Sequence, residues 1–402
     1  MNSLCKHTVL LILSFGTFAS TAFISKFSWK IHHRINDSDK RSNSNKAHND
    51  DSCNDNAQKY TSTRETFITQ VKTASIIASA SILSSNSVSA ASETNPFQSL
   101  QKTSTSTDDV LSALDTSNHF ASYVNGGTAI VTGGNSGIGF ETVASLAKAG
   151  MNVILCSRRY DAGLEAVNTL PTELKNKVVI QKLDLSDMNS IQSATNEILS
   201  LSKNGIDLIV NNAGVIDKKG EPIPTSQGLE LQFGINHVGH QMFTRLLLPS
   251  INKSGRVVTV ASEAHRFAKT DVALAGKGGY SGSKYCNIVF AQGLQDRLNA
   301  IGRNDVKSVS LHPGVIATPL FNKSSGLWNF VPFVADRNKN QGAATTILCS
   351  LVDNETVSGG SYYKDCHVIS PSVETEIAID RLWDETESII ASNGFKMPGQ
   401  LI

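Results

Sequence analysis

Short apolar runs alternate with amphipathic stretches along the chain from residue 128 onward. The runs are rich in Val, Ile and Leu, as expected for strands buried on both faces, and the stretches between them repeat apolar residues at helical spacing. Strands and helices that alternate in this way predict right-handed crossovers and a parallel sheet covered on both sides. The predicted strands are Thr128–Val131, Asn152–Cys156, Val178–Leu183, Asp207–Asn211, Arg256–Ala261 and Val306–His312.

This pattern predicts an α/β fold with a single Rossmann-type, doubly wound parallel sheet and helices on both faces. Length alone would allow a chain of 402 residues to form more than one domain. No internal repeat or linker divides the folded part. We therefore expect one domain over residues 94–398.

The segment before this domain has the composition of a disordered targeting leader. Residues 1–22 resemble a signal peptide, with Lys6, an apolar stretch over Val9–Phe18, and small residues Ser20 and Ala22 before the expected cut. The apolar stretch is short for a membrane span, which favours cleavage. Residues 23–93 begin with many Ser, Asn, Lys and His residues and few aliphatic ones, so they have little apolar surface to offset chain entropy.

The basic, hydroxylated and acid-poor composition after residue 23 is typical of a transit peptide. The sequence from Ala19 to Phe23 resembles the Ala-Phe junction of bipartite leaders in algae with complex plastids. Residues 73–90 resemble a thylakoid-transfer signal without a twin arginine, and the tail of a transit peptide fits them equally well. The leader therefore predicts a plastid reached through the secretory pathway, with the stromal or thylakoid side left open.

Composition excludes some classes of partner. A net charge of +1 with 18% charged residues supplies no basic field for nucleic acid. The six cysteines show no C-x-x-C spacing, which favours reduced structural thiols. His237 and His240 have no third ligand or H-E-x-x-H pattern, so we expect packed or capping histidines and no metal site.

A glycine-rich turn follows the first strand and precedes a helical stretch. Its glycines permit a tight turn and a close approach of the backbone to a pyrophosphate, and the helix N-terminus offers free N–H groups. The T-G-x-x-x-G-I-G spacing resembles that of the short-chain dehydrogenase/reductase family rather than the longer-spaced fingerprint. The expected cofactor contacts here are Gly133, Asn135, Ser136, Gly137, Ile138 and Gly139.

The end of the second strand favours NADP(H) over NAD(H). An NAD enzyme places an acidic residue there, whereas this chain has Ser157, Arg158 and Arg159, and an arginine can pair with a ribose 2′-phosphate. A solvated arginine pair at a helix start is the alternative. The family resemblance implies further cofactor contacts at Asp184, Leu185, Asn211, Asn212, Ala213 and Gly214.

Tyr280 and Lys284 form a Y-x-x-x-K motif at the start of a long helical run. Residues four apart share one face of a helix, and a tyrosine with an ordinary pKa near ~10 needs a nearby positive charge to act as acid and base at neutral pH. Both residues should also contact the cofactor ribose. The resemblance implies that Ser262, 18 residues before the tyrosine, binds the substrate carbonyl and that Asn236 holds a proton relay to the lysine.

The sixth strand ends in a turn that in this family lies against the nicotinamide. The resemblance implies contacts from Pro313, Gly314 and Val315, and from Thr318 to the carboxamide. An apolar segment follows that could form a lid over the substrate, although core packing is the alternative. Its apolar residues are Leu320, Phe321, Leu327, Trp328, Phe330, Val331 and Phe333.

Finer motifs resemble the retinol-dehydrogenase-like branch. They are Gly228–His237, Ser262–His265, Gln341–Ala344, Tyr363–Cys366 and Arg381–Asp384. In those relatives hydride passes between NADPH and an apolar aldehyde or ketone, or in reverse from the alcohol. We therefore expect a small apolar carbonyl or alcohol substrate, and the sequence leaves open a peripheral association with a membrane. The long helices after Gly228 and Tyr280 are where relatives often pair, and their apolar faces do not distinguish a homo-oligomer interface from core.

Two other interpretations of the function remain open. Lys284–Asn287 together with a plastid address resembles light-dependent protochlorophyllide reductase, but that enzyme has a long insertion between its serine-equivalent strand and the tyrosine, which is absent here. The second interpretation is a plastid-envelope member of the family that binds NADPH as a redox sensor. The intact Asn236, Ser262, Tyr280 and Lys284 favour chemistry over sensing alone.

Overall fold

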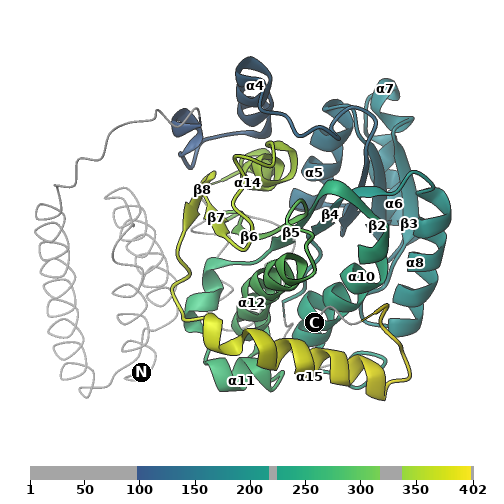
Figure 1. Cartoon of the computed structure of the whole chain (residues 1–402). Coiled ribbons are helices and arrows are strands. Elements are labelled where there is room, and N and C mark those ends of the chain that lie inside the picture. Colours follow the sequence, from purple (N-terminus) through teal and green to yellow (C-terminus); the bar gives the residue numbers. More distant parts are fainter. Residues whose placement is uncertain (1–96, 217–223, 317–336, 400–402) are drawn as a thin grey trace, which may run out of the picture. The chain divides into compact units, whose positions relative to one another are not determined.

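The computed structural model describes residues 97–216, 224–316 and 337–399 (Figure 1). Its centre is an eight-stranded sheet of order β3-β2-β1-β4-β5-β6-β7-β8, in which only β7 and β8 pair antiparallel. The predicted Rossmann-type fold is confirmed. The strands are β1 (Thr128–Thr132), β2 (Asn152–Ser157), β3 (Val178–Lys182), β4 (Ile206–Asn211), β5 (Ile251–Val260), β6 (Lys307–His312), β7 (Tyr362–Lys364) and β8 (His367–Ile369).

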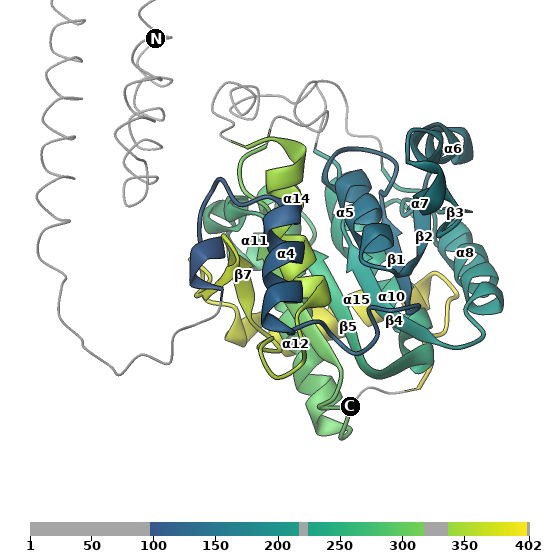
Figure 2. The ribbon, with the colours of Figure 1, turned by 90° about the horizontal axis from the view of Figure 1, so that it is seen from above.

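Alternate residues of the strands enter two separate cores. In β1, Ile130 packs with the core on one face, and Ala129 and Val131 pack with the core on the other. Helices cover both faces, with α5 and α14 on one and α8, α10 and α12 on the other (Figures 1 and 2). The helices are η3 (Gln98–Leu100), α4 (Thr107–Ser117), α5 (Gly137–Lys148), α6 (Tyr160–Asn168), α7 (Thr172–Lys175), α8 (Met188–Leu201), α9 (Leu231–Phe233), η4 (Gly234–Val238), α10 (Gly239–Leu247), η5 (Leu248–Ser250), η6 (Glu263–Phe267), α11 (Thr270–Leu274), α12 (Gly279–Ala300), α14 (Lys339–Leu351), η8 (Glu376–Ala378) and α15 (Ile379–Ser392).

The β7–β8 hairpin extends the sheet beyond the predicted strands. Its two-residue turn places Asp365 and Cys366 at φ of 52° and 62°. Positive φ at both central residues gives the turn a twist that matches the flanking strands. Three-residue strands carry too short an apolar pattern to be predicted from sequence, which explains why these two were missed.

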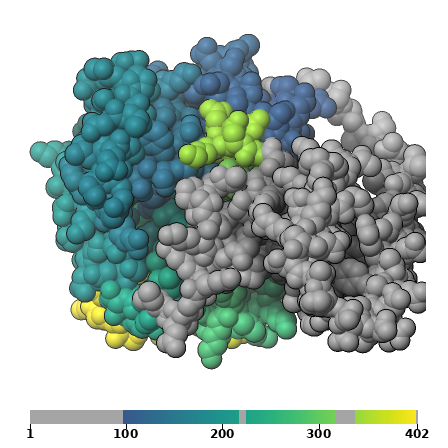
Figure 3. All heavy atoms as spheres, turned by 180° about the vertical axis from the view of Figure 1, so that it is seen from behind, coloured from purple at the N-terminus to yellow at the C-terminus, as the bar shows by residue number. Residues whose placement is uncertain are grey.

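A segment before β1 packs against α14 on one face of the sheet (Figures 2 and 3). Its buried residues Phe97, Leu100, Val110 and Leu114 belong to the same core as β1 and α14. The Tyr123 hydroxyl donates a hydrogen bond of 2.6 Å to the carbonyl of Ser350. Since α14 also packs on α5, this N-terminal segment supports the helix that begins at the glycine-rich turn.

The C-terminal helix α15 packs across α10 and α12. Trp383 stacks on Phe290 of α12, with ring centroids 6.0 Å apart, and Arg245 of α10 pairs with Glu387 at 2.9 Å. Part of the surface of the two long helices is therefore core within one chain. Sequence alone could not distinguish this from a subunit interface.

Several predictions fall on residues outside the described ranges. They include the leader over residues 1–93, Thr318, and the apolar lid from Leu320 to Phe333. Among the described helices, none combines the length and apolar character needed to cross a bilayer. The four described cysteines are free and buried, and burial raises the pKa of each thiol, so they are poor nucleophiles at neutral pH.

Candidate active site

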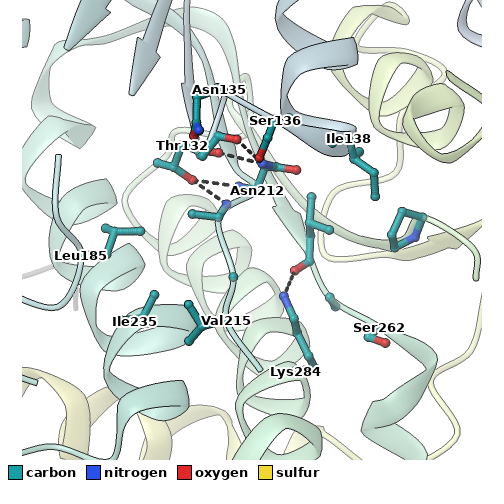
Figure 4. A pocket seen from close by; sticks show the side chains of 18 of the residues that line it. Thr132, Asn135, Ser136, Ile138, Leu185, Asn212, Val215, Ile235, Ser262 and Lys284 are labelled. Atoms are coloured by element: carbon teal, nitrogen blue, oxygen red, sulfur yellow. Dashed lines mark hydrogen bonds between the residues drawn. The ribbon is translucent and has the colours of Figure 1, made fainter. Parts of the chain in front are cut away.

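A cavity of about 310 Å³ lies where the carboxyl ends of the central strands meet. Figure 4 shows Ser136 and Ile138 of the glycine-rich turn at one end, and Ser262 and Lys284 at the other. Ligands of doubly wound sheets bind at this edge, where the strand order reverses. The lining residues are Thr132, Gly133, Asn135, Ser136, Gly137, Ile138, Gly139, Arg158, Leu183, Asp184, Leu185, Asn212, Ala213, Gly214, Val215, Ile235, Val260, Ala261, Ser262, Tyr280, Lys284, His312, Pro313, Gly314 and Ile316.

The glycine-rich turn opens the first turn of α5 toward the cavity. Ser136 precedes the helix in an extended conformation, and Gly137 begins it with φ of 59°. A Cβ added to Gly139 would lie 2.3 Å from the carbonyl oxygen of Gly133 and 2.4 Å from the side-chain nitrogen of Asn212. The backbone around Gly139 is thus too tightly packed for any side chain, which fits a cradle for a pyrophosphate at a helix N-terminus.

Gly139→Ala should weaken NADPH binding about tenfold, because the new methyl group would push the turn away from its present position. Fluorescence titration with NADPH measures the change in Kd. The melting temperature separates this local effect from general destabilisation. An unchanged Kd in a folded variant would contradict a phosphate-binding role for this turn.

The two arginines after β2 have different environments. Arg158 lines the cavity and makes no hydrogen bond or ion pair with any described residue. Arg159 lies outside the lining and pairs with Asp161 at 3.6 Å, with both side chains exposed. Ser157 is also outside the lining, and its hydroxyl donates to the carbonyl of Arg159 at 2.8 Å. Arg158 is therefore the arginine available to a bound anion.

The structure brings most of the remaining predicted site residues to the same cavity. Tyr280, Lys284 and Ser262 line it. The other predicted residues in the lining are Asp184 and Leu185 after β3, Asn212, Ala213 and Gly214 after β4, and Pro313 and Gly314 after β6. The predicted residues that lie outside the lining are Ser157, Arg159, Asn211, Val315 and Asn236, and Thr318 lies outside the described residues.

Ser262 and Tyr280 both line the cavity. Ser262 caps the N-terminus of η6, shortly after β5, and Tyr280 lies in the first turn of α12. Burial raises the pKa of Tyr280 to about 12, and a hydrogen bond with the Ser262 side chain opposes that rise. The phenol is therefore protonated at neutral pH. The lowering of this pKa that the sequence predicts from Lys284 is not seen in the protein alone.

Lys284 reaches the floor of the cavity from the next turn of α12. Its Nζ donates to the carbonyl of Val260 at 2.8 Å and lies 5.7 Å from the centre of the Tyr280 ring. Burial lowers the pKa of Lys284 to about 8. The ammonium group thus keeps its proton at neutral pH but is close to losing it.

Asn236 supports the cavity from behind. It lies in the π-helical turn η4, fully buried, and its side-chain oxygen accepts the N–H of Val215 at 2.8 Å. Its amide nitrogen donates to the carbonyl of Val215 at 3.0 Å and to the hydroxyl of Ser283 at 2.9 Å. The side chain thus links the segment after β4 to α12.

Other lining residues were not predicted as site residues. They are Thr132, Leu183, Val215, Ile235, Val260, Ala261, His312 and Ile316. All are next to predicted residues at strand ends or on the helix of Asn236, so their position was the available signal. Most are apolar or form part of a strand, and such residues look like core in a sequence.

Comparison with known proteins agrees with this geometry. Residues 127–326 match the family model for short chain dehydrogenases. Human retinol dehydrogenase 11 is 35% identical over 275 residues, which is 64% of this chain and 84% of that protein.

The chain belongs to the short-chain dehydrogenase/reductase family. Its relatives place it in the retinol-dehydrogenase-like branch. Short-chain dehydrogenase TIC 32 A, chloroplastic, from Brassica napus is 33% identical over 290 residues, or 66% of this chain and 89% of that protein. A putative uncharacterized protein from Mycobacterium paratuberculosis has a crystal structure with a TM-score of 0.53 and 27% identity, covering 70% of this chain and 97% of its own. The family makes the chain a dehydrogenase/reductase.

Proposed function

We propose that this short-chain dehydrogenase/reductase transfers hydride between NADP(H) and the carbonyl or alcohol carbon of a small apolar substrate. The observation that carries the proposal is a single cavity that joins a tightly packed glycine turn to Ser262, Tyr280 and Lys284. NADPH supplies the hydride when it is bound. The glycine turn and Arg158 would hold its phosphates, and Lys284 its nicotinamide ribose.

The acid/base step falls to Tyr280. In reduction, the hydroxyls of Ser262 and Tyr280 hydrogen-bond the substrate oxygen, and Tyr280 donates its proton to that oxygen as hydride reaches the carbon. Oxidation of the alcohol requires the reverse, in which Tyr280 accepts the proton. A pKa of about 12 keeps the phenol protonated at neutral pH, which is the state that the proton donor needs in reduction.

The preference for NADP(H) is supported by Arg158. A guanidinium group that faces the cavity without a carboxylate partner can form charge-assisted hydrogen bonds with a 2′-phosphate. The ribose hydroxyl of NAD(H) offers no charge to this group. Arg159 is less suited to the role because it pairs with Asp161.

An apolar substrate is supported by the wall beside the tyrosine. Ile216 and Ala264 form a buried apolar cluster with Tyr280. The name of the relative retinol dehydrogenase 11 points to a substrate of the same character. The segment between Ser262 and Tyr280 holds only η6 and α11, so the long insertion of protochlorophyllide reductase has no counterpart here.

Incubating the full chain with NADPH and a panel of apolar aldehydes and ketones tests the proposal. Protochlorophyllide under light is included as the alternative substrate. We expect oxidation of NADPH with at least one apolar carbonyl compound. Tight NADPH binding without turnover on any member of the panel would instead support a sensor.

A plastid location is also proposed. The Ala-Phe junction at residues 22 and 23 supports it, and so does the chloroplastic relative from Brassica napus. Expression of the full chain with a C-terminal fluorescent protein in an alga with a complex plastid tests it. Fluorescence that stays outside the plastid would contradict it.

The rate of carbonyl reduction should fall above about pH 8. Burial lowers the pKa of Lys284 to about 8, so the ammonium that would bind the ribose loses its proton above that pH. Tyr280 keeps its proton until about pH 12 and contributes no fall in this range. The pH profile of kcat/KM for reduction measures the effect. A profile that stays flat to pH 10 would show that the charge on Lys284 is not needed.

A further inference from the structure

His240, one of the two histidines for which the sequence predicts packing or capping, lies behind the cavity. It is in α10, one turn after Asn236, and only 1% of its surface is exposed. Both ring nitrogens have partners. Nδ1 lies 3.0 Å from the main-chain oxygen of Asn236, and Nε2 lies 2.8 Å from the hydroxyl oxygen of Thr132.

The partners fix which nitrogen carries the proton. A carbonyl oxygen can only accept a hydrogen bond, so Nδ1 must be the donor to Asn236. Burial lowers the pKa of His240 to about 4, and Lys284 adds to this effect, so the ring is neutral. Nε2 therefore has a free lone pair, and the Thr132 hydroxyl donates to it.

Thr132 then uses its remaining hydrogen-bonding capacity on the turn after β4. Its hydroxyl oxygen accepts the N–H groups of Asn212 and Ala213, both at 2.9 Å. The alternative acceptor for its proton, the carbonyl of Val210, is 3.4 Å away, which is long for a hydroxyl donor. The fully buried hydroxyl of Thr132 therefore uses both its proton and its two lone pairs in hydrogen bonds.

These contacts form a closed circuit around the cofactor side of the cavity. The circuit runs from the turn after β4 to Thr132, through His240 to Asn236, and from the Asn236 side chain back to Val215 in the segment after that turn. Thr132, Asn212, Ala213 and Val215 all line the cavity. His240 is the only side chain in the circuit that spans from the end of β1 to the helix of Asn236.

We propose that His240 is a positioning residue that couples the end of β1 and the turn after β4 to the helix that bears Asn236, and so sets the affinity for NADPH. This rests on the proposed function only in the choice of cofactor. Loss of the link would leave the Asn236–Val215 contacts to hold the segment after β4 to the helix, and the end of β1 with the Asn212–Ala213 turn could then move relative to the helix.

The experiment is a double-mutant cycle in the full chain, with the Kd of NADPH measured by fluorescence. His240→Phe keeps a ring of similar size and removes both hydrogen bonds. Thr132→Val removes the hydroxyl and keeps the shape. We expect His240→Phe to raise Kd about tenfold, and Thr132→Val to raise it further because this variant also removes the acceptor of the Asn212 and Ala213 N–H groups. The double variant should exceed Thr132→Val by no more than about twofold, because the link to His240 is already broken in that variant.

Two conservative variants test whether the hydrogen bond itself is responsible. Thr132→Ser retains the hydroxyl, and His240→Gln places an amide oxygen near the position of Nε2, so both should bind NADPH more tightly than Thr132→Val. If His240→Phe does not fold, the comparison of His240→Gln with His240→Leu decides the matter, because Thr132 keeps its contacts with Asn212 and Ala213 in both variants. Equal Kd values for these two variants would overturn the proposal.

His237 supplies a matched control. It is also 1% exposed and neutral, since burial lowers its pKa to about 3, but its Nε2 lies 3.0 Å from Thr386 of α15, away from the cavity. His237→Phe should lower the melting temperature and leave Kd within about twofold.

An equal rise in Kd for His237→Phe and His240→Phe would overturn the proposal, as would fully additive effects in the double-mutant cycle. If the wild-type chain binds NADPH but reduces no carbonyl compound, the proposed function fails. The role of His240 is still decided by the same titration.

Discussion

Tyr280→Phe should lower kcat for carbonyl reduction about a thousandfold, the usual contribution of a positioned general acid. The change removes the phenolic proton donor and keeps the ring that packs with Ile216 and Ala264. Ser262 would remain to hold the substrate oxygen, so some activity should persist. The Kd of NADPH should rise by no more than about fivefold, since one neutral hydrogen bond contributes roughly 1 kcal/mol of net binding.

Tyr285 offers the control for this prediction. It lies on the same helix, is fully buried, and its hydroxyl donates to the carbonyl of Glu374 at 2.8 Å rather than to the cavity. Tyr285→Phe should therefore cost stability without changing kcat. Full activity in Tyr280→Phe would exclude this tyrosine as the acid, whatever the outcome at Tyr285.

Arg158→Ala should raise the KM for NADPH about 50-fold and leave the KM for NADH within about twofold. The reason is that a charge-assisted pair with the 2′-phosphate exists only for NADPH. Steady-state kinetics with both cofactors measure the two constants. Arg159→Ala is the matched control, because Arg159 is a neighbouring exposed arginine that pairs with Asp161 outside the cavity.

The control variant should change neither constant by more than about twofold, as expected for a surface ion pair. Equal increases in the KM for NADPH and for NADH in Arg158→Ala would show that this arginine does not bind the 2′-phosphate. A larger increase in the KM for NADPH in Arg159→Ala would show that Arg159 binds the 2′-phosphate instead.

The repeating part of the fold could be predicted from the sequence because its strands are apolar on both faces. Asn152–Ser157 and Lys307–His312 differ from the predicted ranges by one residue. β5 differs more, since it begins at Ile251 instead of near Arg256. Its first residues are partly polar and include Ser254 at a φ of 60°, so they lack a strand pattern.

Elements at the edge of the domain could not be predicted in the same way. Helix α4 has only three buried residues among eleven, and its packing on α14 joins residues that are far apart in sequence. The role of α15 in covering α10 and α12 depends on contacts such as that of Arg245 with Glu387. Such pairings follow from the assembled fold and leave no local pattern.

The candidate site likewise combines residues that have a local signature in the sequence with residues that have none. Glycines at fixed spacing and the Tyr280–Lys284 pair have local signatures, and the structure places them in one cavity. The chain of contacts from Thr132 through His240 to Asn236 joins residues about 100 positions apart, and a buried histidine in an apolar helix resembles core. The raised pKa of Tyr280 also depends on burial, which a motif does not report.

The packing of the segment before β1 limits how far the chain can be shortened from its N-terminus. Phe97 and Leu100 are 3% and 4% exposed, and they belong to the core that β1 and α14 share. A protease that removes a leader must therefore cut before Phe97 to leave this core complete. A recombinant chain that began at residue 127, where the family match starts, would contain every residue of the cavity and still lack part of its own core.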